Sequence, residues 1–170
     1  KDFSIKALNP YIRNNNMKAI LFVVSLFFMT TAQANVFAVN DKIEPVTLED
    51  QFEQPLVVNE QTQVVLFSRG MKGGEFIQEA LEAIPAEKKP ENLAYIADIS
   101  GMPSLIARFV AIPKMKDLPF SMGLDREGEV TASWPAEKDM ATVIVLDKFT
   151  VVSIENFDSS DAIVEAISKK

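Results

Sequence analysis

Continuous apolar runs alternate with helix-like patterns from residue 35 to the end of the chain. The runs at residues 64–68 and 93–100 are typical of strands that are buried on both faces of a sheet. Two shorter strand-like stretches, at residues 44–50 and 55–59, come before them. The pattern therefore predicts four strands between residues 44 and 100.

Two helices are predicted from apolar residues that recur at helical spacing. The first lies after the strand at 64–68 and ends at Pro85. The second follows the strand at 93–100, where Ser100 and Pro103 are helix start signals. The apolar face of the first helix consists of Phe76, Ile77, Ala80, Leu81 and Ile84. The apolar stripe of the second consists of Leu105, Ile106, Phe109 and Val110.

The pattern of apolar and polar residues in the last third of the chain differs from that of the first two thirds. Residues 119–134 contain a strand, an Asp-Arg-Glu-Gly turn and a further extended segment. Residues 141–157 are typical of two strands around Asp147 and Lys148, and a capped helix with an apolar stripe closes the chain. The order β-β-β-α-β-α-β-β-β-α predicts an α/β fold, in which a central mixed sheet is flanked by helices on both faces.

The first 34 residues have the organisation of an export signal preceded by extra sequence. Met17 and Lys18 precede eleven uncharged residues, 19–29, which as a helix would span about 16 Å and so fall short of a bilayer core. Ala32 and Ala34 form the small-x-small pattern of a signal peptidase site. We expect residues 1–16 to be an upstream extension, 17–34 a cleaved signal peptide without a stable membrane anchor, and 35–170 the folded domain in the periplasm.

Composition excludes most catalytic chemistry. The chain has no Cys and no His, which rules out thiol catalysis, disulfides, imidazole bases and the usual transition-metal ligands. Removing residues 1–34 takes away four of seventeen basic residues and one of twenty-four acidic residues, which leaves thirteen against twenty-three and a charge of −10. A surface this acidic repels nucleic acid. We expect no metal and no cofactor, since no flavin or nicotinamide fingerprint is present.

The order and spacing of these segments resemble thioredoxin-like proteins of the TlpA and peroxiredoxin kind. The quoted stretches are "NDKIEPVTLEDQFEQPLVV", "VVLFS", "LPFSMGLDREGEVTASW" and "TVIVLDKFTVVSIENFDSSDAIVEAI", which together cover about residues 39–168. With its signal peptide, its "WPAE" segment and its lack of Cys, the chain is similar to the small secreted proteins of the YtfJ type. The resemblance implies a thioredoxin-like fold and a periplasmic location.

Two hallmarks of that family are missing. The family carries a reactive Cys at the start of the helix after the strand that matches residues 64–68, where the helix dipole lowers the pKa of the thiol. This chain has a glycine-rich basic loop there instead, and at the position of the family's cis-proline it has Ala141, which we expect to be trans. The loop consists of Arg69, Gly70, Met71, Lys72, Gly73 and Gly74. Thiol-disulfide exchange and peroxidase activity are excluded.

Two interpretations of this loop remain open. Backbone N–H groups at a helix N-terminus beside two cations favour a small anion or a carboxylate. Alternatively, the loop is an inert remnant of a redox site, in which the glycines serve the turn and the cations are solvated. It matches neither phosphate-binding glycine motif.

Three functional hypotheses follow. The first is a non-catalytic binding module that contacts a protein or peptide through a groove around Met71, Met140 and Ala141, flanked by Arg69 and Lys72. The second is a small-ligand or enzymatic site that uses Arg69, Lys72, Asp98 and Asp125. A buried Asp98 with a raised pKa close to Lys72 would favour it, and a solvated Asp98 would weaken it. The third is a structural subunit of a larger assembly, for which a large exposed apolar patch would be the sign.

Overall fold

The computed structural model describes residues 35–168 of the protein, and the order of its elements confirms the predicted order. The predicted upstream segment and signal peptide lie outside the described residues. The strands are β1 (Val46–Glu49), β2 (Pro55–Val58), β3 (Val64–Arg69), β4 (Leu93–Asp98), β5 (Gly123–Asp125), β6 (Ala141–Asp147) and β7 (Thr150–Phe157). The helices are α2 (Met71–Ala83), a 3-10 turn (Ala86–Lys88), α3 (Ser104–Ile106), a π-helical turn (Ala107–Ala111), α4 (Ile112–Met115) and α5 (Ser160–Ser168).

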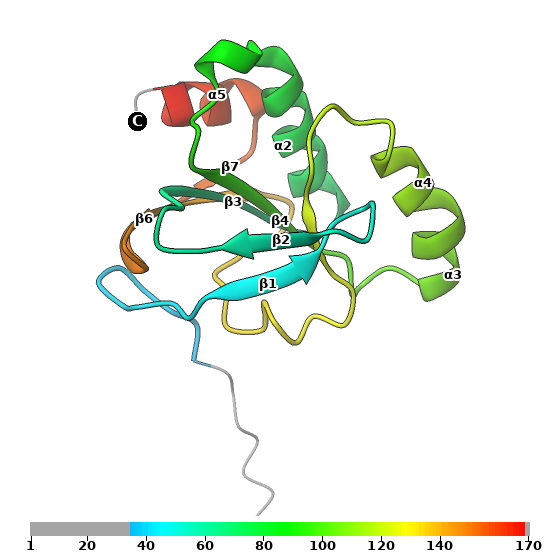
Figure 1. Ribbon diagram of the computed structural model, residues 1–170, viewed down its shortest axis with the longest axis horizontal. Helices are drawn as coiled ribbons and strands as arrows, with labels where there is room; N and C mark the ends of the chain where they lie inside the picture. The colour runs from blue at the N-terminus through cyan, green and yellow to red at the C-terminus, as the bar shows by residue number, and fades with distance from the viewer. Residues whose placement is uncertain (1–34, 169–170) are drawn as a thin grey trace, which may run out of the picture. The chain divides into compact units, whose positions relative to one another are not determined.

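Five strands form one mixed sheet in the order β5-β4-β3-β6-β7, while β1 and β2 form a separate antiparallel hairpin (Figure 1). Strands β3, β4 and β5 are parallel, and β6 and β7 are antiparallel additions on the other side of β3. Helix α2 makes the crossover between the two central parallel strands. This arrangement confirms the prediction of a central mixed sheet with helices.

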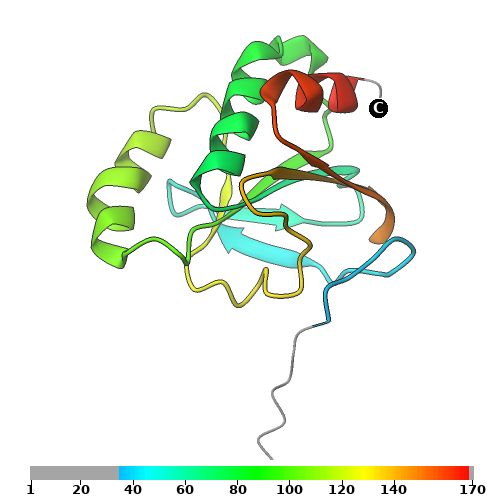
Figure 2. The same ribbon diagram turned by 180° about the vertical axis from the view of Figure 1, so that it is seen from behind.

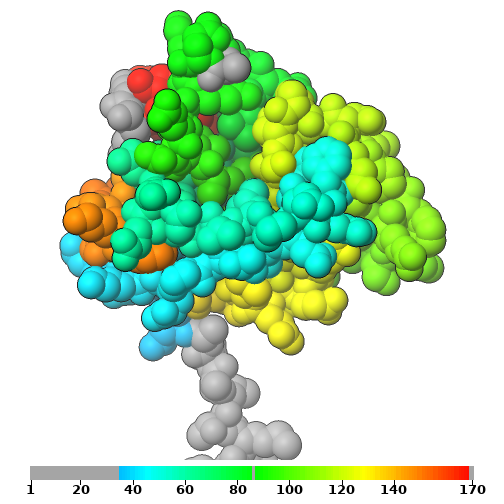
Figure 3. Space-filling view, viewed as in Figure 1, coloured from blue at the N-terminus to red at the C-terminus, as the bar shows by residue number. Residues whose placement is uncertain are grey.

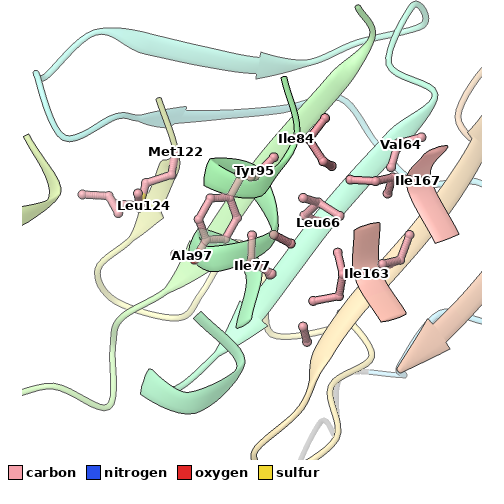
Figure 4. Close-up of a cluster of buried hydrophobic side chains, with 14 of the residues drawn as sticks. Val64, Leu66, Ile77, Ile84, Tyr95, Ala97, Met122, Leu124, Ile163 and Ile167 are labelled. Atoms are coloured by element: carbon pink, nitrogen blue, oxygen red, sulfur yellow. The ribbon is translucent and has the colours of Figure 1, made fainter. Parts of the chain in front are cut away.

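The side chains of the strands alternate between two hydrophobic clusters, one on each face of the sheet. Leu66 and Tyr95 point into the cluster under α2 and α5, where they meet Ile77 and Ile163 (Figure 4). Phe67 points into the other cluster. Because neighbouring residues of a strand face opposite sides, each buried strand must be apolar throughout its length.

The second face of the sheet differs from the expectation of helices on both faces. In residues 35–168 the helices supply residues only to the first cluster. The second cluster is closed instead by the β1–β2 hairpin and by Trp134, whose ring meets Phe67 edge-on at 5.2 Å between centroids. On this face the hairpin and the Trp134 side chain cover the apolar residues of the sheet, as the helices do on the first face.

The helical segment at residues 104–115 has the opposite orientation to the one predicted. Its apolar stripe was expected to face the core, but Leu105 is 70% exposed and Phe109 is 67% exposed. Ala107 is buried instead, and Ile112 and Met115 pack against the first cluster. Both views show this segment standing to one side of α2 (Figures 1 and 2).

None of the helices within residues 35–168 combines the length and the apolar character that a membrane-spanning helix needs.

A buried glutamine fastens the hairpin to the rest of the domain. Gln51 is fully buried at the tip of the hairpin, and its amide nitrogen donates to the carbonyl of Phe120 at 2.7 Å and that of Met115 at 3.3 Å. Its side-chain oxygen accepts from the backbone N–H of Met122 at 3.0 Å. The hairpin is thereby joined to the chain that runs from α4 into β5.

We expect Gln51→Leu to lower the free energy of unfolding by roughly 1–3 kcal/mol, because it leaves buried backbone groups without hydrogen-bond partners. Urea denaturation of the variant and the parent protein measures the difference. Gln61→Leu is the matched control: Gln61 is exposed, and its replacement should change stability by no more than about 0.5 kcal/mol. Equal effects of the two substitutions would contradict the role given to Gln51.

Candidate functional site

Three charged residues end three adjacent parallel strands. In the register of the sheet, Arg69 of β3 lies beside Asp98 of β4, and Asp98 lies beside Asp125 of β5. This is the carboxyl edge of the sheet, where open α/β folds bind their ligands. The structure therefore brings together three of the four residues of the enzymatic hypothesis.

The guanidinium of Arg69 is already occupied by protein partners. Its Nε donates to Oδ2 of Asp98 at 2.8 Å, and one terminal nitrogen donates to the carbonyl of Thr131 at 2.6 Å. The guanidinium also lies over the ring of Phe67, 5.4 Å from its centroid. Arg69 is thus a bridge between the sheet edge and the turn at Thr131, which leaves less of it for an external anion than the anion-site interpretation assumes.

Asp98 is buried, which favours the enzymatic hypothesis, but its other properties oppose that hypothesis. Burial alone would raise the pKa of Asp98, but hydrogen bonds from the hydroxyl and N–H of Ser100, together with the bond and charge of Arg69, outweigh it and lower the pKa. Its charged partner is Arg69, not Lys72. A carboxylate with a lowered pKa is a weak base, so Asp98 is suited to holding structure rather than to accepting a proton.

The carboxylate of Asp125 organises the next turn in the same way. Its Oδ1 accepts from the N–H of Gly128 at 2.8 Å, and its Oδ2 accepts from the N–H and the hydroxyl of Thr131, each at 2.8 Å. Residues 129–134, predicted as extended, consequently fold into turns. No group of three or more acidic residues in the described part of the chain could hold a metal ion.

The glycine-rich loop opens directly into α2. Gly70 is the N-cap, with a φ of 100° and no side chain to bond the free N–H groups, and Met71 is the first helical residue. The side chain of Met71 is 72% exposed. Lys72 is exposed too, and its ammonium lies 5.8 Å from the centroid of the Phe76 ring. Together with Arg69, whose side chain is 40% exposed, these three residues form the accessible part of the loop.

Gly73 and Gly74 are buried and serve close packing. A side chain at Gly73 would overlap the backbone carbonyl of Met140, and one at Gly74 would come within 3.4 Å of the hydroxyl of Tyr95. That hydroxyl lies 3.2 Å from the hydroxyl of Ser68 beneath the helix. Gly73 therefore allows α2 to approach the chain before β6, and Gly74 allows it to approach the side chains of Tyr95 and Ser68 on the sheet.

The residues at the family's cis-proline position are only partly accessible. Ala141 is fully buried and Met140 is half-buried. The described residues contain no cis peptide bond, which confirms that the Ala141 peptide is trans. A partner at this face would therefore meet Met71, Lys72, Gly70 and Met140, whereas Ala141, Gly73 and Gly74 lie beneath the surface. Whether these residues bind a ligand stays a prediction.

Sequence reasoning did not find Thr131, and it identified Gly128 only as part of a turn and not as a contact between two loops. Gly128 has a φ of 73°, and a side chain there would overlap the hydroxyl of Ser100, so the two loops after β4 and β5 meet at this glycine. The Asp-x-x-Gly pattern correctly indicated the turn. No pattern in the sequence indicated that the turn would cover the ends of two other strands.

Fold and site together define a thioredoxin-like α/β protein that carries no cysteine. Comparison with protein-family models and with curated proteins gives no match. Among solved structures, the chain is similar to a peroxiredoxin-like protein from Aquifex aeolicus, with 11% identity, a TM-score of 0.53, and 81% of this chain and 90% of that chain covered. It is also similar to StoA from Bacillus subtilis (8%, TM-score 0.53, 75% and 97% covered) and to a thio-disulfide isomerase from Thermus thermophilus (19%, TM-score 0.51, 76% and 94% covered).

We expect Gly73→Ala to destabilise the protein by about 1–3 kcal/mol, because the added methyl group forces the carbonyl of Met140 away from α2. Gly101→Ala is the matched control, since a side chain at Gly101 would meet nothing within 4 Å. Thermal and urea unfolding of both variants measure the effect. If the two variants are equally stable, the close approach of α2 to Met140 is not what requires a glycine at position 73.

We expect Asp98→Asn to lower stability at neutral pH by about 2 kcal/mol, since charge-assisted hydrogen bonds are lost. The folded pKa of Asp98 lies below 3.8, the ordinary value of an aspartate side chain. The contribution of the Asp98 carboxylate to the free energy of unfolding is therefore fully present above the unfolded pKa, and it disappears as pH falls through the folded pKa. The difference between variant and parent should shrink below about pH 4 in urea titrations. Asp147→Asn, at an exposed position, is the control, and a difference that is independent of pH would contradict the assignment.

Proposed function

We propose that the protein is an exported, redox-inactive thioredoxin-like module that acts by binding a protein or a peptide. One observation carries the proposal. The start of α2, where the thioredoxin-like family places its nucleophile, presents Met71 with 72% of its surface exposed and with no reactive group. An exposed thioether on a short loop supplies apolar, adaptable contact area and no chemistry at neutral pH.

The other residues of this edge support binding over catalysis. Asp98 and Asp125 use their carboxylate oxygens to accept hydrogen bonds from the protein's own groups. Arg69 is bonded to Asp98 and Thr131. What remains accessible is apolar surface at Met71 and Met140, the charge of Lys72 and the exposed 40% of the Arg69 side chain. This combination fits a peptide with an apolar residue beside a carboxylate.

The sequence supports the exported location. The predicted signal peptide, residues 17–34, ends in Ala32-Gln33-Ala34, and cleavage would release a domain that begins at Asn35. A domain without thiols needs no particular redox environment to fold. Binding by this module should therefore be the same under oxidising and reducing conditions.

Photo-cross-linking in a Gram-negative host tests the proposal. A photoreactive phenylalanine analogue replaces Met71 in one variant and Glu60, an exposed residue of the β2–β3 loop, in a control. We expect a discrete adduct in the periplasmic fraction for position 71 and none for position 60. The adduct should contain a chain that begins at Asn35, and its yield should be unchanged by a reducing agent. Identical labelling at the two positions would count against a binding face at Met71, and a cytoplasmic adduct with residues 17–34 retained would count against export.

A further inference from the structure

The helical segment at residues 104–116 exposes an apolar surface that the rest of the described chain leaves uncovered. Figure 3 shows the segment at the right-hand margin of the molecule. Four large side chains project from it into solvent: Leu105 is 70% exposed, Phe109 67%, Ile106 49% and Val110 47%. Scattered apolar residues are ordinary on a surface, but four in six consecutive positions form a contiguous patch of the kind that marks an interaction site.

The orientation of this segment follows from its packing. Small Ala107 faces inward, and Ile112 and Met115 pack on the first hydrophobic cluster. The π-helical turn at Ala107–Ala111 inserts an extra residue between the two short helices. It thereby changes the side of the helical segment on which each later residue lies. The segment has enough apolar residues to cover the core on one side and to present a stripe on the other.

The charge of the segment is opposite to that of the domain. Residues 104–116 contain Arg108, Lys114 and Lys116 and no acidic residue, whereas residues 35–170 carry a net charge of −10. The ion pairs found within residues 35–168 are Arg69–Asp98 and Arg126–Glu49, so none of the segment's three cations is paired with a carboxylate. The guanidinium of Arg108 lies 5.5 Å from the ring centroid of Phe109, so a cation and an aromatic ring are presented together.

A hollow of about 650 Å³ lies beside the segment. Arg108, Lys116 and Arg126 supply positive charge to its walls, Ser100 and Ser104 supply hydroxyl groups, and Ile112 supplies an apolar floor. Glu53 and Glu127 also contribute to the lining. The lining thus has three cations against two carboxylates, and Arg126 is paired with Glu49 at 3.8 Å, so the positive charge on the segment's side of the hollow comes from Arg108 and Lys116. These two cations beside an apolar floor can accommodate a side chain that carries a carboxylate on an apolar stem.

We infer that residues 104–116 dock an acidic amphipathic segment of a partner protein. Its apolar side chains would cover Leu105 and Phe109, and its carboxylates would meet Arg108 and Lys116. A two-fold pair of copies of this chain would instead bring the same cations face to face, and an anionic membrane would be repelled by the rest of the domain. The inference rests on the proposed binding role but uses residues other than Met71.

Fluorescence anisotropy with the full chain tests the inference. The probe is a labelled synthetic peptide in which Leu and Phe recur at helical spacing and Glu fills the remaining positions. We expect saturable binding that Phe109→Ser weakens roughly tenfold or more, as for an aromatic anchor of an interface. Arg108→Glu should weaken it roughly tenfold at low ionic strength and less at high salt. Both side chains are exposed, so unchanged unfolding curves should verify that the variants are folded.

Matched controls distinguish this surface from general stickiness. Val152→Ser removes an apolar side chain that is 52% exposed on β7, and Lys148→Glu reverses an exposed charge at the β6–β7 turn. Neither should alter the dissociation constant. A peptide with Lys in place of Glu should not bind, and binding of that peptide as tightly as the acidic one would overturn the inference, as would the absence of saturable binding.

Two further measurements examine the other occupants. Cosedimentation with phosphatidylglycerol vesicles that Phe109→Ser abolishes would assign the surface to a membrane instead. Concentration-dependent dimerisation lost in the same variant would assign it to a second copy. Either result overturns the inference. If peptide binding fails while the adduct at Met71 is retained, the docking surface is wrong and the proposed function stands.

Discussion

The fold depends on the ion pair between Arg69 and Asp98 at the carboxyl edge of the sheet. A buried carboxylate is tolerated only with hydrogen-bond donors around it, and the chain after β4 supplies them by turning back at Ser100. Asp125 does the same for the chain after β5, and Arg69 ties that second turn to β3 through Thr131. Arg69, Asp98 and Asp125 thus form a polar row across the ends of β3, β4 and β5. This row holds the loops that follow β4 and β5, and these loops lead to the start of α3 and to Trp134.

The same three residues limit the number of free polar groups at this edge. Ligands of open α/β sheets bind beyond the carboxyl ends of the strands because free N–H groups and polar side chains converge there. In this protein the polar side chains are satisfied by one another. The start of α2 retains its free N–H groups, but Gly73 lies against Met140 so closely that no larger residue fits. The residues that stay exposed at this edge are Arg69, Gly70, Met71 and Lys72.

The sequence predicted the strands and α2 because both carry strong periodic patterns that packing reinforces. It failed at residues 104–115, where apolar residues occupy more than one side of the helix and spacing alone does not tell which side faces inward. Inward-facing Ala107 is small and outward-facing Phe109 is large, the reverse of what burial of the larger residue would give. Gln51, Thr131 and the engagement of Arg69 were missed for another reason: each depends on contacts with residues far away in the sequence, which no local pattern records.

The exposed stripe of Leu105, Ile106, Phe109 and Val110 contributes less to the stability of the domain than buried residues of the same types would. Only 30–53% of the surface of each of these residues is covered, and the transfer free energy gained on folding scales with the area buried. The three cations of the segment have no carboxylate partner in residues 35–168, and salt screens their attraction to more distant acidic groups. A fold selected only for its own stability would have polar residues at these positions, as the outer faces of most surface helices do. Large exposed apolar side chains next to a charge opposite to that of the whole domain are matched best by a surface that is apolar and acidic, and this complementarity is the physical basis of the proposed docking of an acidic partner segment.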